Sequence, residues 1–258
     1  MQRRPPLTDP ATRFLIAVNV GIFVLQFLAG PAWGHVERLF ALTEDGLREG
    51  ALWQLVTYQF LHANEMHILV NMLALWFAGR ELEPAIGTRR FVALYLVGGV
   101  VGGLAQMIFS SGPLVGASAS VCAVLLALTS LFPNLQVMAL IFFVLPLRMR
   151  ARTLGIGMVA LSVLLWLSGW MPEVGHLAHL GGFATGWAFG LYYRRSLGEG
   201  GASGWSLPPL PWQSSSHLRA LPTVDEVLTK VLRHGIDSLT REECEILEAN
   251  RRPRRREM

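Results

Sequence analysis

Residues 176–193 read HLAHLGGFATGWAFGLYY. No Asp, Glu, Lys or Arg interrupts this run, and its eighteen residues approach the ~20 that an α-helix needs to cross a bilayer. Gly182, Gly186 and Gly190 recur every fourth residue, a spacing that lets another helix backbone approach closely in lipid. His179 lies near the beginning of the run. The stretch therefore predicts a membrane helix that packs tightly against a neighbour and carries an ionisable side chain near one end.

Five further apolar runs have the length of a membrane helix. They cover residues 14–33, 66–83, 91–110, 115–132 and 154–171. The whole chain of 258 residues is 52% hydrophobic and 16% charged, which is apolar for a soluble domain. A shorter run, 135–147, is bounded by Pro133 and Pro146, so we expect an interfacial or re-entrant piece there. The fold class predicted is an all-α polytopic membrane protein with six transmembrane helices.

The basic residues give this bundle an orientation, because Lys and Arg gather in cytoplasmic connections. With six spans, all the arginine clusters of the membrane part fall on one side. They are Arg3, Arg4 and Arg13 before the first span, Arg80, Arg89 and Arg90 around the second connection, Arg148, Arg150 and Arg152 before the fifth span, and Arg194 and Arg195 after the sixth. We therefore expect a multi-pass protein of the inner or plasma membrane with both termini cytoplasmic. Glu83 with Arg80 is expected to form an ion pair or a cap at the inner boundary.

Four polar side chains within the spans are candidates for a functional site, because such residues are costly in lipid. His67 and Asn71 lie one turn apart at the start of the second span, Ser118 opens the fourth, and His179 lies near the start of the sixth. Ser118 precedes Pro133 by fifteen residues, and His179 precedes Arg194 by the same number. At helical rise this corresponds to about 22 Å in each case. The two side chains are therefore predicted to lie at one level, near the outer face.

Serine and histidine at one level suggest nucleophilic catalysis. A hydroxyl attacks a carbonyl when a neighbouring base accepts its proton, and imidazole suits that task. We predict Ser118 as nucleophile and His179 as base, in a dyad, because no Asp or Glu lies in the outer half of the nearby spans. His67, Asn71 and the Ser118 backbone N–H are candidate donors to the oxyanion. No metal-binding motif accompanies the histidines, so neither a metal nor a cofactor is expected.

The motifs that carry these residues resemble the rhomboid intramembrane serine proteases from about residue 53 to 190. They are WQLVTYQFLH at 53–62, HANEMHILVN at 62–71, EPAIG at 83–87, GAS at 116–118 and AHLGGFATG at 178–186. The resemblance implies a six-helix core that cleaves transmembrane protein substrates near their outer ends. It also implies Ser118 and His179 as catalytic residues and His67 and Asn71 as oxyanion-site residues.

The chain departs from many members of that family at three positions. Ala119 replaces a glycine after the nucleophile, Cys122 replaces an aromatic residue four positions after it, and Gln54 replaces an arginine in the outer loop. Ala119 is expected to crowd the backbone near the oxyanion, and Cys122 removes a ring that stacks on the base. The alternative function is a catalytically inactive rhomboid-like membrane protein that binds or chaperones its clients. The partners expected are transmembrane proteins and the lipid bilayer, without nucleic acid.

The C-terminal part is polar. We divide the chain into a membrane domain at 1–195, a flexible linker at 196–222 and a small cytoplasmic helical domain at 223–258 with a basic tail. Thr223 with Glu226 and Thr240 with Glu243 have the spacing of capping boxes, and Gly235 is expected to end the first helix. The pattern predicts a helical hairpin held by Leu228, Val231, Leu232, Ile236, Leu239 and Leu247.

Overall fold

A computed structural model of the chain describes residues 9–109, 112–141, 145–171, 174–199, 224–235, 238–240, 243–244 and 247. Two units are separated by their internal contacts, Met1–Leu210 and Pro211–Met258. The predicted linker at 196–222 and the basic tail lie almost entirely outside the described residues. Residues 196–199 are the exception, because they continue the last helix of the first unit.

Each of the six predicted spans is a helix, so the all-α membrane bundle predicted from the sequence is confirmed. The helices are α1 (Pro10–Ala29), α5 (Glu65–Ile86), α6 (Thr88–Phe109), α7 (Ser118–Leu131), α8 (Ala151–Ser168) and α9 (His176–Glu199). Three helical stretches among the described residues are long and apolar enough to cross a membrane, namely Pro10–Phe40, α6 and α8, while α7 is apolar but shorter. α5 and α9 carry the polar candidate residues, which lowers their mean hydropathy.

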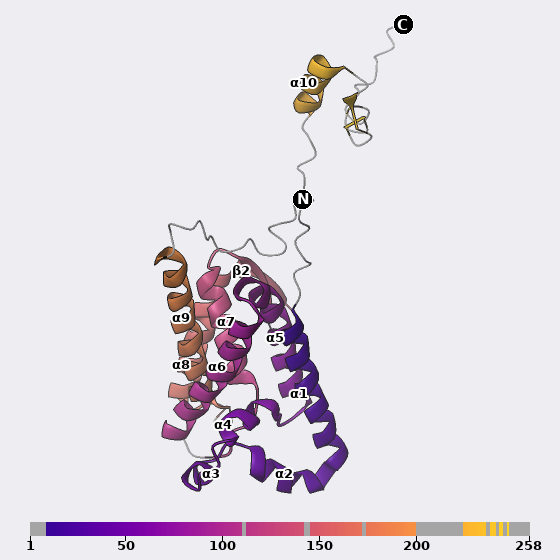
Figure 1. The fold of residues 1–258 in the computed structure, drawn as a ribbon. Helices are drawn as coiled ribbons and strands as arrows, with labels where there is room; N and C mark the ends of the chain where they lie inside the picture. The colour runs from indigo at the N-terminus through magenta and orange to yellow at the C-terminus, as the bar shows by residue number, and fades with distance from the viewer. Residues whose placement is uncertain are drawn as a thin grey trace. The chain divides into compact units, whose positions relative to one another are not determined.

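α7 lies inside the bundle and packs against α5, α6, α8 and α9. α1 packs on α5 along one edge, and α8 packs on α7 and α9 along the other (Figure 1). The side chains buried in α8 are few, Ala151, Gly155 and Ser162. This helix therefore turns most of its apolar surface outward, as a lipid-facing helix does.

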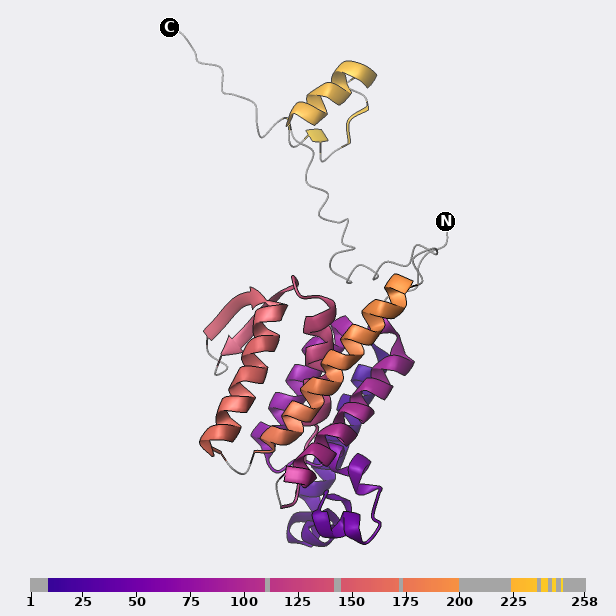
Figure 2. The same ribbon diagram turned by 90° about the vertical axis from the view of Figure 1, so that its left-hand side faces the viewer.

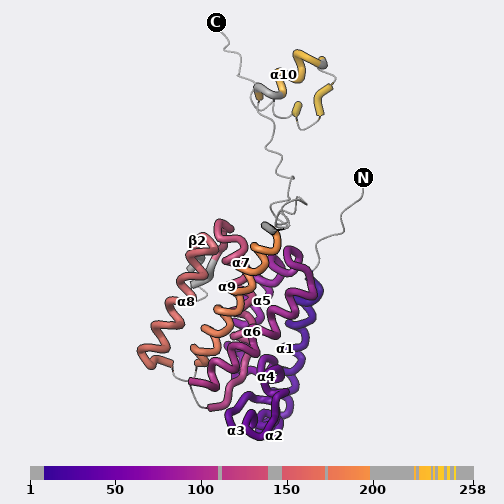
Figure 3. Tube along the Cα trace, turned by 60° about the vertical axis from the view of Figure 1, so that its left-hand side comes forward, coloured from indigo at the N-terminus to yellow at the C-terminus, as the bar shows by residue number. Residues whose placement is uncertain are grey.

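Short elements occupy the two ends of the bundle. Between α1 and α5 the chain forms the 3₁₀ turns η1 (Gly30–Ala32) and η2 (Tyr58–Phe60) and the helices α2 (Trp33–Phe40), α3 (Glu44–Arg48) and α4 (Gln54–Thr57). α2, α3 and α4 gather at the end where α7 and α9 begin (Figures 2 and 3). At the opposite end, β1 (Gln136–Ile141) and β2 (Leu145–Arg150) form an antiparallel hairpin.

Residues 135–147, where the sequence predicts an interfacial or re-entrant segment rather than a span, contribute to this hairpin. β1 pairs with β2 from Gln136↔Arg150 to Ile141↔Leu145, a strand pairing that the sequence did not predict. Pairing within the hairpin satisfies the backbone N–H and C=O groups of this apolar run without a span. The prolines that bound the run excluded a helix but did not distinguish a hairpin from an irregular segment.

Glu83 fixes α1 to the C-terminal end of α5. Its carboxylate is buried and accepts hydrogen bonds from the backbone N–H of Ala11 (3.0 Å) and of Thr12 (2.8 Å) and from the hydroxyls of Thr12 and Thr88 (2.8 Å each). These backbone donors belong to the first turn of α1, where helical N–H groups lack partners and favour a negative charge. Of the two predicted roles, an ion pair with Arg80 or a cap, the structure shows the cap, because Arg80 pairs with Glu81 (3.3 Å). The helix that Glu83 caps is distant in sequence.

The second unit contains α10 (Val224–His234), which ends at Gly235 with φ +81° as predicted. Thr240 and Glu243 form the predicted capping box, with 2.7 Å from the Thr240 nitrogen to Glu243 and 3.4 Å from the Glu243 nitrogen to the Thr240 hydroxyl. The Lys230 ammonium lies 2.7 Å from the Glu243 carboxylate and, with the Thr240 N–H, lowers the pKa of Glu243 to about 2.

One detail of the predicted hairpin in this unit is wrong. Leu228 and Leu232 are exposed, whereas Val227 is buried. The apolar stripe of α10 is therefore rotated by about one residue from the predicted one. The first predicted capping box, Thr223 with Glu226, lies outside the described residues.

Replacing Glu83 by Ala leaves several donors of α1 and Thr88 without a partner in a buried site. We expect Glu83→Ala to lower the free energy of unfolding by about 3 kcal/mol or more. Thermal unfolding in detergent micelles measures the loss. Glu65→Ala, an exposed change in the first turn of the same helix, is the control and is expected to cost ~0.5 kcal/mol or less. Equal losses in the two variants would contradict the assignment of Glu83 as an anchor.

Candidate active site

The contact between α7 and α9 depends on glycine. A methyl group on Gly182 would overlap the carbonyl oxygen of Ala119, and one on Gly186 would overlap the carbonyl oxygen of Ala123. Because these are backbone atoms, they cannot move aside as a flexible side chain does. The tight packing predicted from the glycine spacing is therefore confirmed.

This contact brings Ser118 and His179 together. Ser118 is the first residue of α7, and His179 lies in the first turn of α9. The Ser118 Oγ and the His179 Nε2 are 2.8 Å apart, within hydrogen-bond distance. Among the described residues, no carboxylate forms a hydrogen bond or ion pair with His179. The geometry suits proton transfer between the two groups, and their catalytic roles stay a prediction.

The turn before Ser118 brings a second helix close to the pair. Gly116 has φ +129°, a conformation that side chains other than glycine rarely adopt. A methyl group there would lie 2.6 Å from Cε1 of His67, so the imidazole of His67 rests against this backbone. The turn is held by hydrogen bonds from the Gly116 nitrogen to the Tyr58 carbonyl (2.9 Å) and between Leu114 and Leu42 in both directions (2.8 and 3.0 Å). Gly116 thus joins His67, the outer loop and the start of α7.

His67 and Asn71 lie in the first two turns of α5. Asn64 caps this helix, with its Oδ1 accepting from the His67 nitrogen at 2.9 Å. Asn71 is buried and donates one amide N–H to the His67 carbonyl at 2.8 Å. A primary amide has two N–H donors, so one remains for another acceptor. The structure thus places His67 beside the turn that leads to Ser118 and turns one Asn71 donor toward its own helix.

The structure shows what surrounds Ala119 and Cys122, two of the residues that depart from the rhomboid pattern. The methyl group of Ala119 faces Gly102 of α6, where a methyl group would come within 2.5 Å of it. The methyl group of Ala119 therefore fills the space beside Gly102 of α6. Cys122 is buried in α7, and the ring of His176 lies edge-on to that of His179 at 6.2 Å between centroids.

His176 was not among the predicted site residues. It is buried, and its Nε2 lies 3.2 Å from the carbonyl oxygen of Trp170. Its position three residues before His179 on one helix places both rings on the same face. That spacing was visible in the sequence, but it did not indicate which ring would contact the other.

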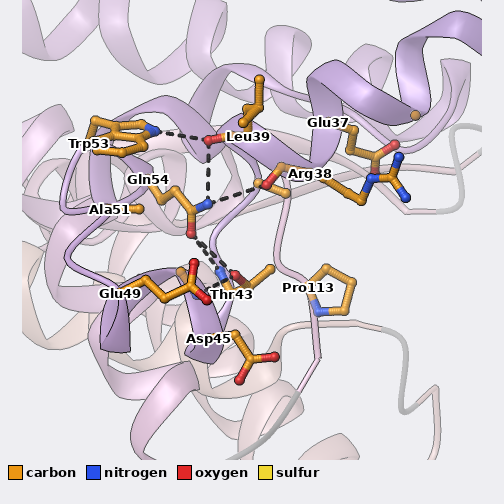
Figure 4. Close-up of a pocket in the computed structure, with 13 residues that line it drawn as sticks. Glu37, Arg38, Leu39, Thr43, Asp45, Glu49, Ala51, Trp53, Gln54 and Pro113 are labelled. Carbon is orange, nitrogen blue, oxygen red and sulfur yellow. Dashed lines mark hydrogen bonds between the residues drawn. The ribbon is translucent and has the colours of Figure 1, made fainter.

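Gln54 organises the segment between α1 and α5 (Figure 4). Its buried amide accepts from the nitrogen and hydroxyl of Thr43 (3.2 and 3.3 Å) and donates to the carbonyls of Arg38 and Leu39 (3.4 Å each). Trp53 donates from its indole nitrogen to the same Leu39 carbonyl at 2.9 Å. These bonds connect α2, α3 and α4 around a cavity of about 620 Å³ that Pro113 also lines.

A second buried amide, that of Gln59, contacts the first turn of α7. Gln59 accepts from the Ser120 hydroxyl at 2.9 Å and donates to the Leu55 carbonyl at 2.8 Å. The Gln59 side chain occupies the space beside Gly99, and the Tyr58 hydroxyl donates to the Gly99 carbonyl at 2.6 Å. Local sequence patterns do not indicate this polar contact, because its partners lie 41 residues apart along the chain.

His62 lies in the loop before α5, outside the membrane-spanning helices. Its ring is 2% exposed, neither ring nitrogen has a protein partner among the described residues, and it packs edge-on against His67 at 5.1 Å. Burial and, secondarily, the nearby His67 lower the pKa of His62 from 6.5 to about 4. The His62 backbone nitrogen donates to the side-chain oxygen of Gln26 in α1 (3.1 Å), and the Gln26 amide nitrogen donates to the His62 carbonyl (3.3 Å). His62 is thus a neutral buried ring behind His67.

The fold and the paired side chains define a polytopic helical membrane protein with a candidate serine-type site. The Rhomboid domain matches residues 49–196, more than half of the chain. The chain belongs to the rhomboid family, whose members are integral membrane proteins and include proteases.

Named relatives agree with this membership. RHOMBOID-like protein 1 of Arabidopsis thaliana is 34% identical over 169 residues, which cover 64% of this chain and 41% of that protein. Rhomboid protease GluP of Bacillus subtilis is 31% identical, over 73% of this chain and 36% of GluP. Rhomboid protease GlpG of Klebsiella pneumoniae is 27% identical, over 69% of this chain and 61% of GlpG. The chain thus matches less than two thirds of the length of each.

Gly182 and Gly157 provide a matched pair of glycine-to-alanine changes. Gly182→Ala inserts a methyl group into the backbone of α7, and overpacking of this kind costs about 1–3 kcal/mol or more. Gly157 of α8 has open space around its Cβ position, so Gly157→Ala is expected to be neutral or to stabilise by up to ~1 kcal/mol through helix propensity. Melting temperatures in one detergent compare the two. A Gly182→Ala protein as stable as Gly157→Ala would refute the close contact.

His62 predicts a pH dependence of stability. Because its folded pKa, about 4, lies below the unfolded value of 6.5, the unfolded chain binds the extra proton between these values. Stability is therefore full above pH 6.5 and falls as pH drops toward 4, by at most about 3 kcal/mol. His62→Phe keeps a ring but cannot titrate, so it is expected to lose less stability between pH 7 and pH 4.5. If the melting temperatures of the unchanged protein and of His62→Phe fall equally between pH 7 and pH 4.5, His62 does not contribute to the pH dependence.

Proposed function

We propose that the chain is an intramembrane serine endopeptidase that hydrolyses peptide bonds of transmembrane proteins near the outer membrane face. The observation that carries the proposal is the 2.8 Å separation of the Ser118 Oγ and the His179 Nε2. Family membership and two relatives named as proteases support it. The rest of the reaction follows from the residues around this pair.

In the first step, Ser118 attacks the carbonyl carbon of the scissile bond. With the proton of the neutral imidazole on Nδ1, Nε2 of His179 accepts the hydroxyl proton as the Oγ–C bond forms. The oxygen of the tetrahedral intermediate carries the negative charge. Collapse of the intermediate breaks the C–N bond, and the imidazolium returns its proton to the leaving amine. The product is an acyl-enzyme on Ser118 and a free amine.

In the second step, water hydrolyses the ester. His179 accepts a proton from water as the oxygen attacks the acyl carbon, and returns it to the Ser118 oxygen when the ester bond breaks. The carboxylic acid is released and the dyad is restored. Among the described residues no carboxylate pairs with His179, and the ring of His176 packs edge-on against the imidazole at 6.2 Å between centroids.

Three donors are available to the oxyanion. The Ser118 backbone N–H is at the start of α7, where the N–H groups of the first turn are unpaired and the helix dipole favours an anion. His67 contributes a ring N–H from beside Gly116, and Asn71 contributes the amide N–H that its own helix leaves unused. Removal of one preorganised oxyanion donor typically lowers kcat by about 10²–10³.

The arginine clusters give the proposed site its side of the membrane. Arg148, Arg150, Arg152, Arg194 and Arg195 lie in β2, at the start of α8 and near the end of α9, whereas α7 and α9 begin with the dyad residues or within a turn of them. By the positive-inside tendency the arginine-rich end is cytoplasmic, which puts the termini inside and the dyad near the outer face of the inner or plasma membrane.

A serine-reactive probe tests the proposal directly. We expect a fluorophosphonate to label the full chain on Ser118 and to fail on Ser118→Ala and His179→Ala, because the hydroxyl or its base is missing. Ser130→Ala is the control, since Ser130 lies on the same helix and its hydroxyl donates only within the helix, at 3.0 Å to Ala127. Cleavage of a single-span substrate with a destabilised helix, followed by gel analysis, is expected to show the same pattern.

The same experiment separates the enzyme from an inactive rhomboid-like binding protein. A binding protein would retain the substrate but show neither labelling nor cleavage in the unchanged chain. Cleavage that persists in Ser118→Ala would locate the activity elsewhere. Either result would overturn the proposal, provided that the melting temperature shows the protein to be folded.

A further inference from the structure

A groove lies at the end of the bundle opposite the dyad, where α7 and α9 end and α8 begins. Its volume is about 260 Å³. α7 lies between α8 and α9 in this region (Figure 2). The groove has an apolar wall made of Leu126, Ile156, Trp187 and Leu191. Two arginines, Arg152 and Arg194, also line it, so one hollow combines apolar surface with positive charge.

Glycines keep the floor of this groove narrow. A methyl group on Gly155 would lie 2.6 Å from the Thr129 hydroxyl, and one on Gly190 would overlap the Ser130 hydroxyl. α8 and α9 therefore both approach α7 closely at these positions. The larger side chains stand on either side and form the walls.

Among the described residues, no carboxylate pairs with either of the two arginines. Arg194 donates to the carbonyls of Ser130 and, at 3.3 Å, of Leu131, at the end of α7. These bonds fix its guanidinium, which retains further N–H donors. The Arg152 side chain has no hydrogen-bond or ion-pair partner in the described part of the chain, and no acidic residue lines the groove. The site is therefore built for an anion.

We propose that this groove binds an anionic glycerophospholipid, with its phosphate between Arg152 and Arg194 and an acyl chain along the apolar wall. Guanidinium groups bind phosphate through paired charge-assisted hydrogen bonds. Ile156 and Trp187 are 70% and 56% exposed, so the wall continues into the outward faces of α8 and α9 that contact lipid tails. Tryptophan favours this interfacial level. A soluble phosphate would use the arginines but leave the apolar wall unoccupied.

The bound lipid would strengthen the attachment of α8. Only Ala151, Gly155 and Ser162 of α8 are buried, so protein contacts hold this helix weakly. A lipid that contacts Arg152 and Ile156 of α8 together with Trp187 and Arg194 of α9 bridges the two helices. We therefore expect the lipid to raise the melting temperature. This inference does not depend on the proposed peptidase activity.

Lipid retention by the full chain tests the proposal. The protein is purified in a neutral detergent, and phosphatidylglycerol or phosphatidylcholine with the same acyl chains is added at equal concentrations. We expect native mass spectrometry to show one retained phosphatidylglycerol and little phosphatidylcholine, and thermal unfolding to shift upward only with the former. Arg152→Gln is expected to weaken phosphatidylglycerol binding about fivefold or more. Arg89→Gln, an exposed arginine at the start of α6 and outside the groove, is the matched control and is expected to change it little.

Several outcomes would overturn the site. Equal retention of the two lipids by the unchanged chain would show that charge does not select the lipid, and this comparison needs no variant to fold. Equal weakening by Arg152→Gln and Arg89→Gln would indicate general attraction to the arginine-rich end. Displacement of phosphatidylglycerol by an equal concentration of glycerol phosphate would show that the groove recognises phosphate without the acyl chain.

Discussion

The backbone contact of α9 with α7 is the constraint on which the candidate site depends. Gly182 lies against the Ala119 carbonyl, Ala119 follows Ser118, and Gly182 lies one turn after His179 on the same helix. The contact that sets the distance between the helices therefore also sets the register between hydroxyl and imidazole. A larger residue at position 182 would separate the helices before it changed either reacting group, so the geometry of the pair is a property of packing.

Around this contact, the buried side-chain amides of Gln54 and Gln59 form hydrogen bonds with neighbouring polar groups. Gln54 hydrogen-bonds to backbone groups of α2 and to Thr43 before α3, and Gln59 connects Ser120 of α7 to Leu55 of α4. Each amide has both donors and acceptors, so it pairs with buried polar groups that would otherwise lack a hydrogen-bond partner. The segment from α2 to η2 is therefore held by directional bonds, and the Tyr58 carbonyl of η2 accepts from the Gly116 nitrogen in the turn before α7.

The sequence predicted those features that repeat with the period of a helix. The six spans follow from the lengths of the apolar runs, and the α7–α9 contact follows from Gly182, Gly186 and Gly190, because helix length and close packing leave local signals. Ser118 and His179 were predicted to lie at one level because each precedes the predicted inner end of its helix by fifteen residues, and this prediction needed no knowledge of neighbouring side chains.

Features that depend on distant partners were beyond the sequence. Glu83 bonds to residues of α1 that are more than seventy positions away, and no local pattern distinguishes that pairing from an ion pair with Arg80. The hairpin β1–β2 was missed because a short apolar run between prolines has no unique period. The stripe of α10 was misplaced by one residue because a helix of eleven residues contains too few apolar positions to define its face.

The capping of α1 by Glu83 has a consequence for the order of biosynthesis. α1 is translated before α5, yet the carboxylate that pairs with its opening amides belongs to a residue made 72 and 71 positions later. Until α5 has left the ribosome, these amides must remain hydrated at the membrane surface. α1 therefore takes its final place only after α5 has been made, and its docking reports that synthesis has reached that helix.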